Sequence, residues 1–287
     1  MRSDERWSKI LARLASQDHV STKELSEELG VSSVTIRSDL QHLEDRGRIK
    51  RVLGGAMLAT KVLETTHEAR STVDGLQKLA MAAKALTLIE PGTSVVLDVG
   101  TSTFALAELI AKDQTLTGLT LVTNGLRIAS ALEGALPRNE VFVTGGMLRV
   151  MQHSLVQSGV AEGLSRFRSS IAFIGCDGIH PDHGVTTTNL PEADVKEAMR
   201  INSDRAVLLA AGSKLGEVGS VRVNGVSAFD TLITSEDADP VIVAELQELG
   251  LEVLIAEQQL AFDVLASNGG ANSDGLARSK SLGGVTT

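Results

Sequence analysis

Aromatic residues, cysteines and long apolar runs are all scarce in this sequence. Aromatic side chains make up only 2% of the 287 residues, so a hydrophobic content of 43% must build its core from aliphatic and alanine side chains. The single cysteine, Cys176, excludes an internal disulfide and fits a reducing compartment. No apolar run approaches the roughly 20 residues that a membrane-spanning helix needs, and Met1–Lys9 lacks the pattern of a signal peptide. We therefore expect a cytoplasmic protein without a membrane partner, long enough for two domains with buried cores.

Acidic residues outnumber basic residues in this chain, but only after residue 60. The sequence carries 27 Lys and Arg against 36 Asp and Glu, a formal net charge of −9. Residues 1–60 hold 10 basic and 9 acidic side chains, which leaves 17 basic and 27 acidic side chains for the remainder. Within 46–51 four of the six residues are basic and none is acidic. An acidic bulk that repels DNA, joined to a locally basic N-terminal part, favours selective over indiscriminate DNA binding.

Residues 21–57 predict a winged helix-turn-helix. Ser21 and Glu24 have the spacing of a capping box, which satisfies backbone N–H groups at the start of a helix. Gly30 suits the left-handed position that ends this helix, and Ser32 can cap the next one. A basic, glycine-bearing hairpin follows the second helix and has the composition of a wing, which usually contacts the phosphate backbone of DNA.

The second helix of this motif has one apolar and one polar face. Ile36, Leu40 and Leu43 recur at i, i+4 and i+7 and predict the stripe that packs on the core. At about 100° per residue, the opposite face carries small or polar side chains of the kind that read base edges, and Arg37 can reach guanine or a phosphate. The residues that we expect to contact DNA are Ser33, Val34, Thr35, Arg37, Ser38, Gln41, His42, Arg48, Lys50 and Arg51.

An ordinary helical domain with a solvated polar face is the alternative, because helix-turn-helix spacing alone is common. In this chain the capping box, the glycine turn, the polar face and the basic hairpin occur together. Their combination favours DNA binding.

From Leu76 onwards, short apolar runs rich in β-branched residues alternate with helical stretches. This alternation predicts an α/β domain with a largely parallel sheet. Continuously apolar runs fit strands that are buried on both faces. The predicted strands are Val95–Val99, Leu119–Thr123, Glu140–Thr144, Ser170–Ile174, Arg205–Ala210, Thr231–Thr234 and Glu252–Ile255.

Small, hydroxyl, amide or charged residues follow nearly every predicted strand. In open α/β sheets, ligands bind at the carboxyl ends of strands near a topological switch point. Glycine lets the backbone approach an anion, hydroxyls add donors, and a helix N-terminus offers free N–H groups. A hydroxylated anion such as a sugar phosphate would use this set. The candidate residues are Gly100, Thr101, Ser102, Thr103, Asn124, Gly146, Arg149, Asp177, Glu192, Lys196 and Lys214.

Each of these residues alone also has a purely structural interpretation. A glycine after a strand usually makes a tight turn, Asp177 could cap a turn, and Glu192 with Lys196 could be a surface i, i+4 ion pair. Their recurrence at successive strand ends supports a ligand site. We expect neither a metal nor a cofactor.

The run VSSVTIRSDLQHLEDRGRIKRVLGGAM resembles the N-terminal signature of the DeoR family of bacterial transcription regulators. Two residues depart from the family pattern. Ser38 stands where a basic residue is usual, and Leu53 where an aromatic residue or histidine is frequent. In the resemblance both lie on the DNA-facing side, which implies weaker phosphate contacts there or a different preferred operator.

The runs LDVGTST, VTNGL, VTGGMLR, FIGCDGI, GVTT and GSKLG resemble the effector domain of the same family, over residues 76–256. That domain is similar in turn to ribose-5-phosphate isomerase and related sugar-phosphate enzymes. The resemblance implies that Gly100–Thr103 hold a phosphate and that Asp177, Glu192 and Lys214 stand where the isomerase-like fold places its polar groups. Where the family often reads Asp-Ser-Ser-Lys, residues 211–214 are Ala-Gly-Ser-Lys, which removes one partner for a sugar hydroxyl.

These predictions divide the chain into four parts. Residues 1–57 form the winged helix-turn-helix, 58–75 a linker, 76–262 an isomerase-like α/β domain that senses a sugar phosphate, and 263–287 a disordered tail. The tail is expected to be disordered because Gly, Ser, Asn and Thr dominate it.

The leading hypothesis is a transcription regulator of a carbohydrate-metabolism operon, a repressor that leaves its double-stranded DNA operator when a phosphorylated sugar binds. Since one head reads only a short half-site, we expect a homo-oligomer, either a dimer or a tetramer. The helix predicted at Leu76–Ile89, beside the linker, is the first candidate to transmit the change.

The alternative from another class is a sugar-phosphate isomerase-like enzyme with an accessory head, in which Asp177, Glu192 and Lys214 do acid–base chemistry. The helix-turn-helix argues against it, because an isomerase would not need one. An architectural DNA-binding protein without a ligand would leave the polar strand ends unexplained.

Overall fold

The computed structural model describes residues 3–16, 20–45, 49–52, 55–58 and 75–270. The chain divides into two compact units, Met1–Thr65 and Thr66–Thr287, here called the head and the α/β domain. Among the described residues, no helix is long and apolar enough to cross a membrane.

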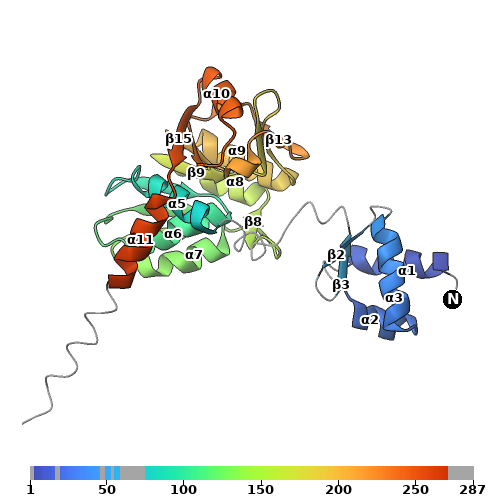
Figure 1. Ribbon diagram of the computed structural model, residues 1–287. Coiled ribbons are helices and arrows are strands. Elements are labelled where there is room, and N and C mark those ends of the chain that lie inside the picture. The colour runs from blue at the N-terminus through green and yellow to red at the C-terminus, as the bar shows by residue number, and fades with distance from the viewer. Residues whose placement is uncertain (1–2, 17–19, 46–48, 53–54, 59–74, 271–287) are drawn as a thin grey trace, which may run out of the picture. The chain divides into compact units, whose positions relative to one another are not determined.

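The head is a winged helix-turn-helix. It consists of helices α1 (Ser3–Ser16), α2 (Thr22–Leu29) and α3 (Ser33–Asp45) and of strands β1 (Val20–Ser21), β2 (Ile49–Val52) and β3 (Gly55–Leu58) (Figure 1). The strands form an antiparallel sheet in the order β1-β3-β2. Its buried core consists of Ile10, Leu14, Val20, Leu25, Ile36, Leu40, Leu43, Ile49 and Ala56.

Capping fixes where α2 and α3 begin, as the sequence predicts. Ser21 N donates to Glu24 Oε2 at 2.8 Å and Glu24 N donates to Ser21 Oγ at 3.1 Å, which is the reciprocal capping box. Gly30 ends α2 in the left-handed conformation, with φ of 64°. Thr35 N donates to Ser32 Oγ at 3.2 Å at the start of α3.

A seven-stranded parallel sheet forms the centre of the α/β domain. Its strand order is β15-β14-β12-β9-β4-β5-β6. These strands are β4 (Ser94–Leu97), β5 (Thr120–Thr123), β6 (Glu140–Val143), β9 (Ile171–Gly175), β12 (Ala206–Leu209), β14 (Thr231–Ser235) and β15 (Glu252–Ala256). All seven predicted strands are present, and every pair is parallel.

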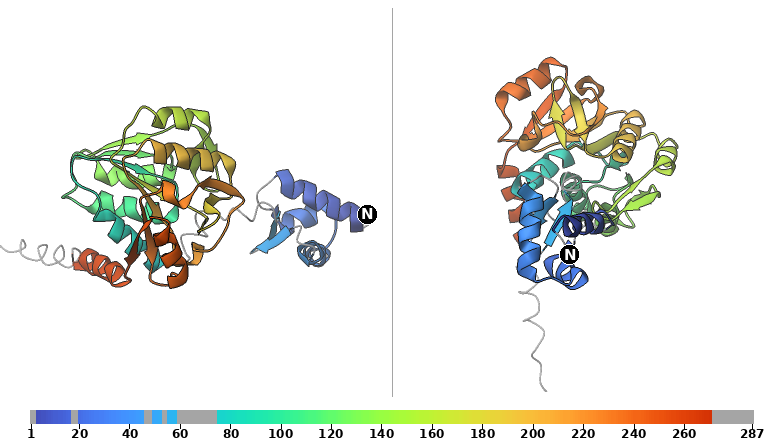
Figure 2. Two further views of the ribbon diagram at one scale, coloured as in Figure 1. Left: turned by 90° about the horizontal axis from the view of Figure 1, so that it is seen from above. Right: turned by 90° about the vertical axis from the view of Figure 1, so that its right-hand side faces the viewer.

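Helices cover both faces of this sheet (Figures 1 and 2). One face packs on α5 (Gly75–Leu86), α6 (Thr101–Lys112), α7 (Leu126–Ala131), the 3₁₀ turn η1 (Leu132–Ala135) and α11 (Gln259–Gly270). The other face packs on α8 (Ser158–Leu164), α9 (Leu190–Ile201) and α10 (Pro240–Glu248). In β4, Val95 and Leu97 belong to the first core and Val96 to the second, which explains why the strand is continuously apolar.

Short antiparallel strands that the sequence reasoning missed sit beside the main sheet. Strand β7 (Met147–Arg149) pairs with β8 (Ser154–Val156). Strand β11 (Gly184–Thr187) pairs with β10 (Gly178–His180) and with β13 (Val221–Asn224). The 3₁₀ turns η2 (Gly212–Lys214) and η3 (Val226–Ala228) complete the domain. These strands are only three or four residues long and most of them lack the continuous apolar run that marks the strands of the main sheet, so they were not recognised from sequence.

The predicted boundaries need one correction and leave two segments without a description. The expected disorder of 263–287 is wrong at its start, because α11 continues to Gly270. Leu260, Ala261 and Val264 on this helix pack into the apolar core beside α5, and this burial offsets the polar composition that follows. Residues 271–287 lie outside the described part of the chain. The same holds for 59–74, which is nearly all of the expected linker.

Candidate functional site

The exposed face of α3 carries most of the side chains that were expected to contact DNA. Val34 is 70% exposed, and Ser33, Arg37, Ser38 and Gln41 are also exposed, whereas Thr35 is half-buried. A groove of about 590 Å³ borders this face. Its lining residues come from α2, α3 and the wing, and they are Thr22, Lys23, Ser26, Glu27, Ser33, Arg37, Arg51 and Gly55.

The wing is tied to α3 by two hydrogen bonds of Arg51. Arg51 N donates to Glu44 Oε1 at 2.8 Å, and Arg51 Nη1 donates to Gln41 Oε1 at 2.9 Å. These bonds link Arg51, an expected phosphate contact of the wing, to α3, whose exposed face is expected to read bases. Arg48, Leu53 and the side chain of Lys50 lie outside the described residues, so their expected roles stay predictions.

His42 is placed differently from what the face argument predicts. Its ring stacks on Trp7 of α1, with 3.9 Å between ring centroids and 17° between planes. The side chain is half-buried, because this side of α3 packs on α1. A direct contact of His42 with bases is therefore not supported by its position in the head.

Asp39 is a residue of α3 that the sequence reasoning missed. It accepts hydrogen bonds from Arg6 Nη2 at 2.8 Å and from Trp7 Nε1 at 2.8 Å, and it is buried. These contacts join α1 to α3, the helix that is expected to face DNA. The signal was available, since Asp39 falls inside the apolar stripe between Ile36 and Leu40, where a charged side chain needs a partner.

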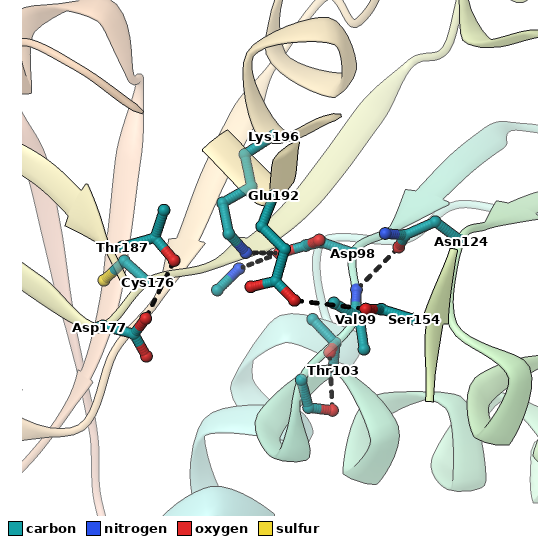
Figure 3. Close-up of polar contacts among 12 residues, drawn as sticks. Asp98, Val99, Thr103, Asn124, Ser154, Cys176, Asp177, Thr187, Glu192 and Lys196 are labelled. Atoms are coloured by element: carbon teal, nitrogen blue, oxygen red, sulfur yellow. Dashed lines mark hydrogen bonds and ion pairs between the residues drawn. The ribbon is translucent and has the colours of Figure 1, made fainter. Parts of the chain in front are cut away.

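The α/β domain has its topological switch point between β4 and β9. The chain runs from β4 outwards through β5 to β6 and then returns to β9 on the other side of β4. Asp98 follows β4 directly, and Cys176 and Asp177 follow β9. Ligand sites of open parallel sheets lie outside the carboxyl ends of such strands. The candidate residues Asn124, Glu192, Lys196 and Asp177 lie there (Figure 3).

An ion pair between Asp98 and Lys196 lies deepest in this region. The two side chains are 1% and 5% exposed, and Gly175 N also donates to Asp98 Oδ2, at 3.0 Å. Burial lowers the pKa of Lys196, but the carboxylates of Asp98 and Glu192 outweigh burial, and the net shift of this pKa is upward. Lys196 is therefore a charged partner for acids. Asp98 was not among the predicted residues, although an acid directly after an apolar strand is a signal that could have found it.

A second ion pair connects the β7–β8 hairpin to α9. Arg149 of β7 pairs with the carboxylate of Glu192, and Ser154 Oγ of β8 donates to the same oxygen, Oε1, at 3.3 Å. The two side chains of the ion pair are only 13% and 9% exposed. The sequence expected Arg149 and Glu192 in one site but gave no signal for Ser154.

Asp177 and Lys214 close the other side of the site. Asp177 Oδ2 accepts from Thr187 Oγ1 at 2.9 Å and from Thr188 N at 3.0 Å. Lys214 Nζ donates to the carbonyl of Cys176 at 2.5 Å. Cys176 itself is buried, and burial raises the pKa of its thiol, so it is an apolar core residue rather than a nucleophile.

Three of the candidates have local contacts or close packing that limit what they can offer a ligand. Thr103 is buried, and its hydroxyl donates to the carbonyl of Gly100 at 3.0 Å. Asn124 accepts from Val99 N at 3.0 Å and donates to the carbonyl of Leu155, so its amide links the start of α6 to β8. Gly146 has φ of 120°. A Cβ there would lie 2.6 Å from Val160 Cγ2, which explains the glycine by close packing.

The N-terminus of α6 remains open to an anion. Gly100 has no side chain with which to cap the helix, and Thr101 and Ser102 are half-buried at its first turn. The uncapped N–H groups and the helix dipole suit a phosphate or a carboxylate. No group of three or more His, Cys, Asp or Glu side chains in the described part of the chain could hold a metal ion.

A winged helix-turn-helix and an α/β domain with polar strand ends define a DNA-binding protein with a ligand-binding domain. Comparison with known proteins identifies the family. The family model "DeoR-like helix-turn-helix domain" matches residues 6–62, and "DeoR C terminal sensor domain" matches residues 74–236. The chain belongs to the DeoR family of transcription regulators, and it is a regulator rather than an enzyme. The isomerase alternative is therefore wrong.

Two relatives show how far the similarity extends. The HTH-type transcriptional regulator GlpR of Haloferax volcanii is 35% identical over 251 residues, which cover 87% of this chain and 96% of the relative. The glycerol-3-phosphate regulon repressor of Escherichia coli K12 is 29% identical over 240 residues, covering 84% and 93%. Among solved structures, a ribose 5-phosphate isomerase A from Methanocaldococcus jannaschii matches with 16% identity and a TM-score of 0.35, over 50% of this chain and 54% of that one.

Proposed function

We propose that this chain is a cytoplasmic repressor of a carbohydrate-metabolism operon and that a phosphorylated sugar releases it from its operator. The observation that carries the proposal is the set of groups at the switch point. This set contains three cations and three carboxylates near the uncapped start of α6. Arg149 pairs with Glu192, and Lys196 pairs with Asp98. Lys214 binds the carbonyl of Cys176, next to Asp177. Cations and N–H groups suit a phosphate, and carboxylates suit sugar hydroxyls. The name of the Escherichia coli relative, a glycerol-3-phosphate regulon repressor, agrees with this chemistry.

Release requires that the ligand bind the DNA-competent and DNA-incompetent states with different affinity. Helix α5 is the proposed connection, because it is the first described element after the linker and packs on α6, whose N-terminus lies at the site. A single head reads one half-site, so the proposal includes a dimer or a tetramer.

A thermal-shift screen of the full chain against a panel of sugar phosphates tests the proposal. The expected result is at least one compound that raises the melting temperature and also releases the protein from its own upstream DNA in a gel-shift assay. The matching sugars without the phosphate are the control, and they should do neither. The proposal fails if no phosphorylated sugar changes both the melting temperature and DNA binding.

A further inference from the structure

The carboxylate of Glu192 is held in a small cradle of donors. Its Oε1 atom accepts from the guanidinium of Arg149 and from Ser154 Oγ, the latter at 3.3 Å. Ser154 and Glu192 are buried, and Arg149 is partly buried. A guanidinium and a hydroxyl that converge on one oxygen form the donor set that also binds a phosphate oxygen.

The Glu192 carboxylate does not serve as the cap of α9. Glu192 is the third residue of the helix, where a glutamate often caps the N-terminus. Here Asn189 is the cap, and its Oδ1 accepts from Glu192 N at 3.2 Å. The Glu192 side chain instead crosses to the β7–β8 hairpin and points toward Ser154 (Figure 3).

The uncapped start of α6 lies close to the same place. Val99, just before Gly100, donates its N–H to Asn124 Oδ1 at 3.0 Å. Asn124 Nδ2 in turn donates to the carbonyl of Leu155, the neighbour of Ser154, at 3.2 Å. The helix N-terminus and the hairpin therefore flank one site, and the Glu192 carboxylate reaches from α9 to the donors of the hairpin.

We propose that Glu192 occupies, as an internal carboxylate, the subsite that takes the phosphate group of the ligand, so that binding exchanges one anion for another on Arg149 and Ser154. This inference rests on the proposed function and adds where the phosphate sits and what it displaces. Lys196 lies one turn further along α9, at the i, i+4 spacing at which a lysine can pair with a glutamate, so the displaced carboxylate keeps a cation beside it.

The exchange also gives ligand binding a mechanical consequence. The Arg149–Glu192 ion pair joins β7 to α9, so an anion that takes Arg149 removes this link between the strand and the helix. Glu192 also makes the site selective for anionic ligands, since a neutral sugar cannot replace its carboxylate on the guanidinium of Arg149. A ligand must therefore bring a negative charge to open the pair.

Calorimetric titration of the full chain with inorganic phosphate tests the inference. Glu192→Gln removes the competing charge and should tighten phosphate binding by about tenfold or more, whereas Arg149→Gln should weaken it by a similar factor. Glu197→Gln is the matched control, because Glu197 lies on the same helix but pairs with Arg200, and it should leave the affinity unchanged. Unchanged or weaker phosphate binding by Glu192→Gln overturns the inference.

A second variant covers the case in which Glu192→Gln does not fold. Ser154→Ala removes one cradle donor and a single oxygen atom, and it should weaken phosphate binding several-fold. Equal affinity in Ser154→Ala contradicts the inference. The two proposals can fail separately. If a sugar phosphate releases DNA but Glu192→Gln binds phosphate no more tightly than the wild type, only the inference about the phosphate subsite is refuted. Tighter phosphate binding by Glu192→Gln without DNA release by any sugar phosphate removes only the proposed function.

Discussion

Asp98 and Lys196 form an ion pair that is almost completely shielded from solvent, although they lie 98 positions apart in the chain. Asp98 directly follows the central strand β4, and Lys196 projects from α9 on one face of the sheet. The pair therefore fixes α9 over the switch point, and with it Glu192. Because both side chains are buried, loss of either charge would leave the other unpaired away from water and would destabilise the folded domain.

Lys196→Met is expected to destabilise the α/β domain by about 3–5 kcal/mol, because it leaves the buried Asp98 carboxylate without its cation. Urea unfolding followed by circular dichroism measures the loss. The double variant Asp98→Asn with Lys196→Met removes both charges, so it should recover a large part of the lost stability. Equal instability of the single and double variants would contradict a pairwise role.

Gly146→Ala should disturb the hairpin that carries Arg149. The added Cβ would lie 2.6 Å from Val160 Cγ2 and 2.7 Å from the Val156 carbonyl, at a φ of 120°. We expect a loss of about 1–3 kcal/mol in the free energy of unfolding, together with weaker phosphate binding. Gly145→Ala is the matched control. Its φ of 70° is also positive, but no atom lies within 4 Å of the added Cβ, so only the backbone cost of about 1 kcal/mol should appear.

Asp39→Asn should loosen α3 in the head. The substitution removes the ion pair with Arg6 and weakens the acceptor for Trp7 Nε1, and we expect a loss of about 2–3 kcal/mol. Trp7 is the only tryptophan of the chain, so its fluorescence during urea unfolding reports on the head alone. The exposed Asp182 offers a control, since Asp182→Asn should leave the tryptophan transition in place. If the tryptophan fluorescence of Asp39→Asn and of the wild type changes at the same urea midpoint, the role of Asp39 is disproved.

The acid sensitivity of the α/β domain should depend in part on Glu197. Hydrogen bonds from the Arg200 guanidinium, and then from Asn224, outweigh burial and hold the pKa of Glu197 below its ordinary value of 4.5. This contribution to stability is present above pH 4.5 and is lost as the pH falls through the lowered pKa. The difference in unfolding free energy between the wild type and Glu197→Gln should therefore shrink between about pH 5 and about pH 3. A difference that stays constant over this range would refute the effect.

The seven main strands and the capping of the head were predictable because their signals are local. A buried parallel strand is continuously apolar, and a capping box such as Ser21 with Glu24 spans three residues. The contacts of the candidate site were not predictable in the same way. The Asp98–Lys196 pair and the contact of Ser154 with Glu192 depend on which strands and helices become neighbours. His42 shows the same limit, since a position on a helical face does not reveal that a neighbouring helix offers Trp7 as a stacking partner.

Control of DNA binding by the α/β domain is tested most directly by fluorescence anisotropy of the labelled upstream DNA with the full chain. The wild type should bind, Arg37→Ala should bind about tenfold or more weakly, and Arg166→Ala, an exposed arginine of the α/β domain, should bind normally. Adding the sugar phosphate that stabilises the wild type should release the DNA, and Arg149→Gln should need a much higher concentration. Equal DNA affinity of the wild type and Arg37→Ala, or DNA binding that no sugar phosphate changes, would contradict this control.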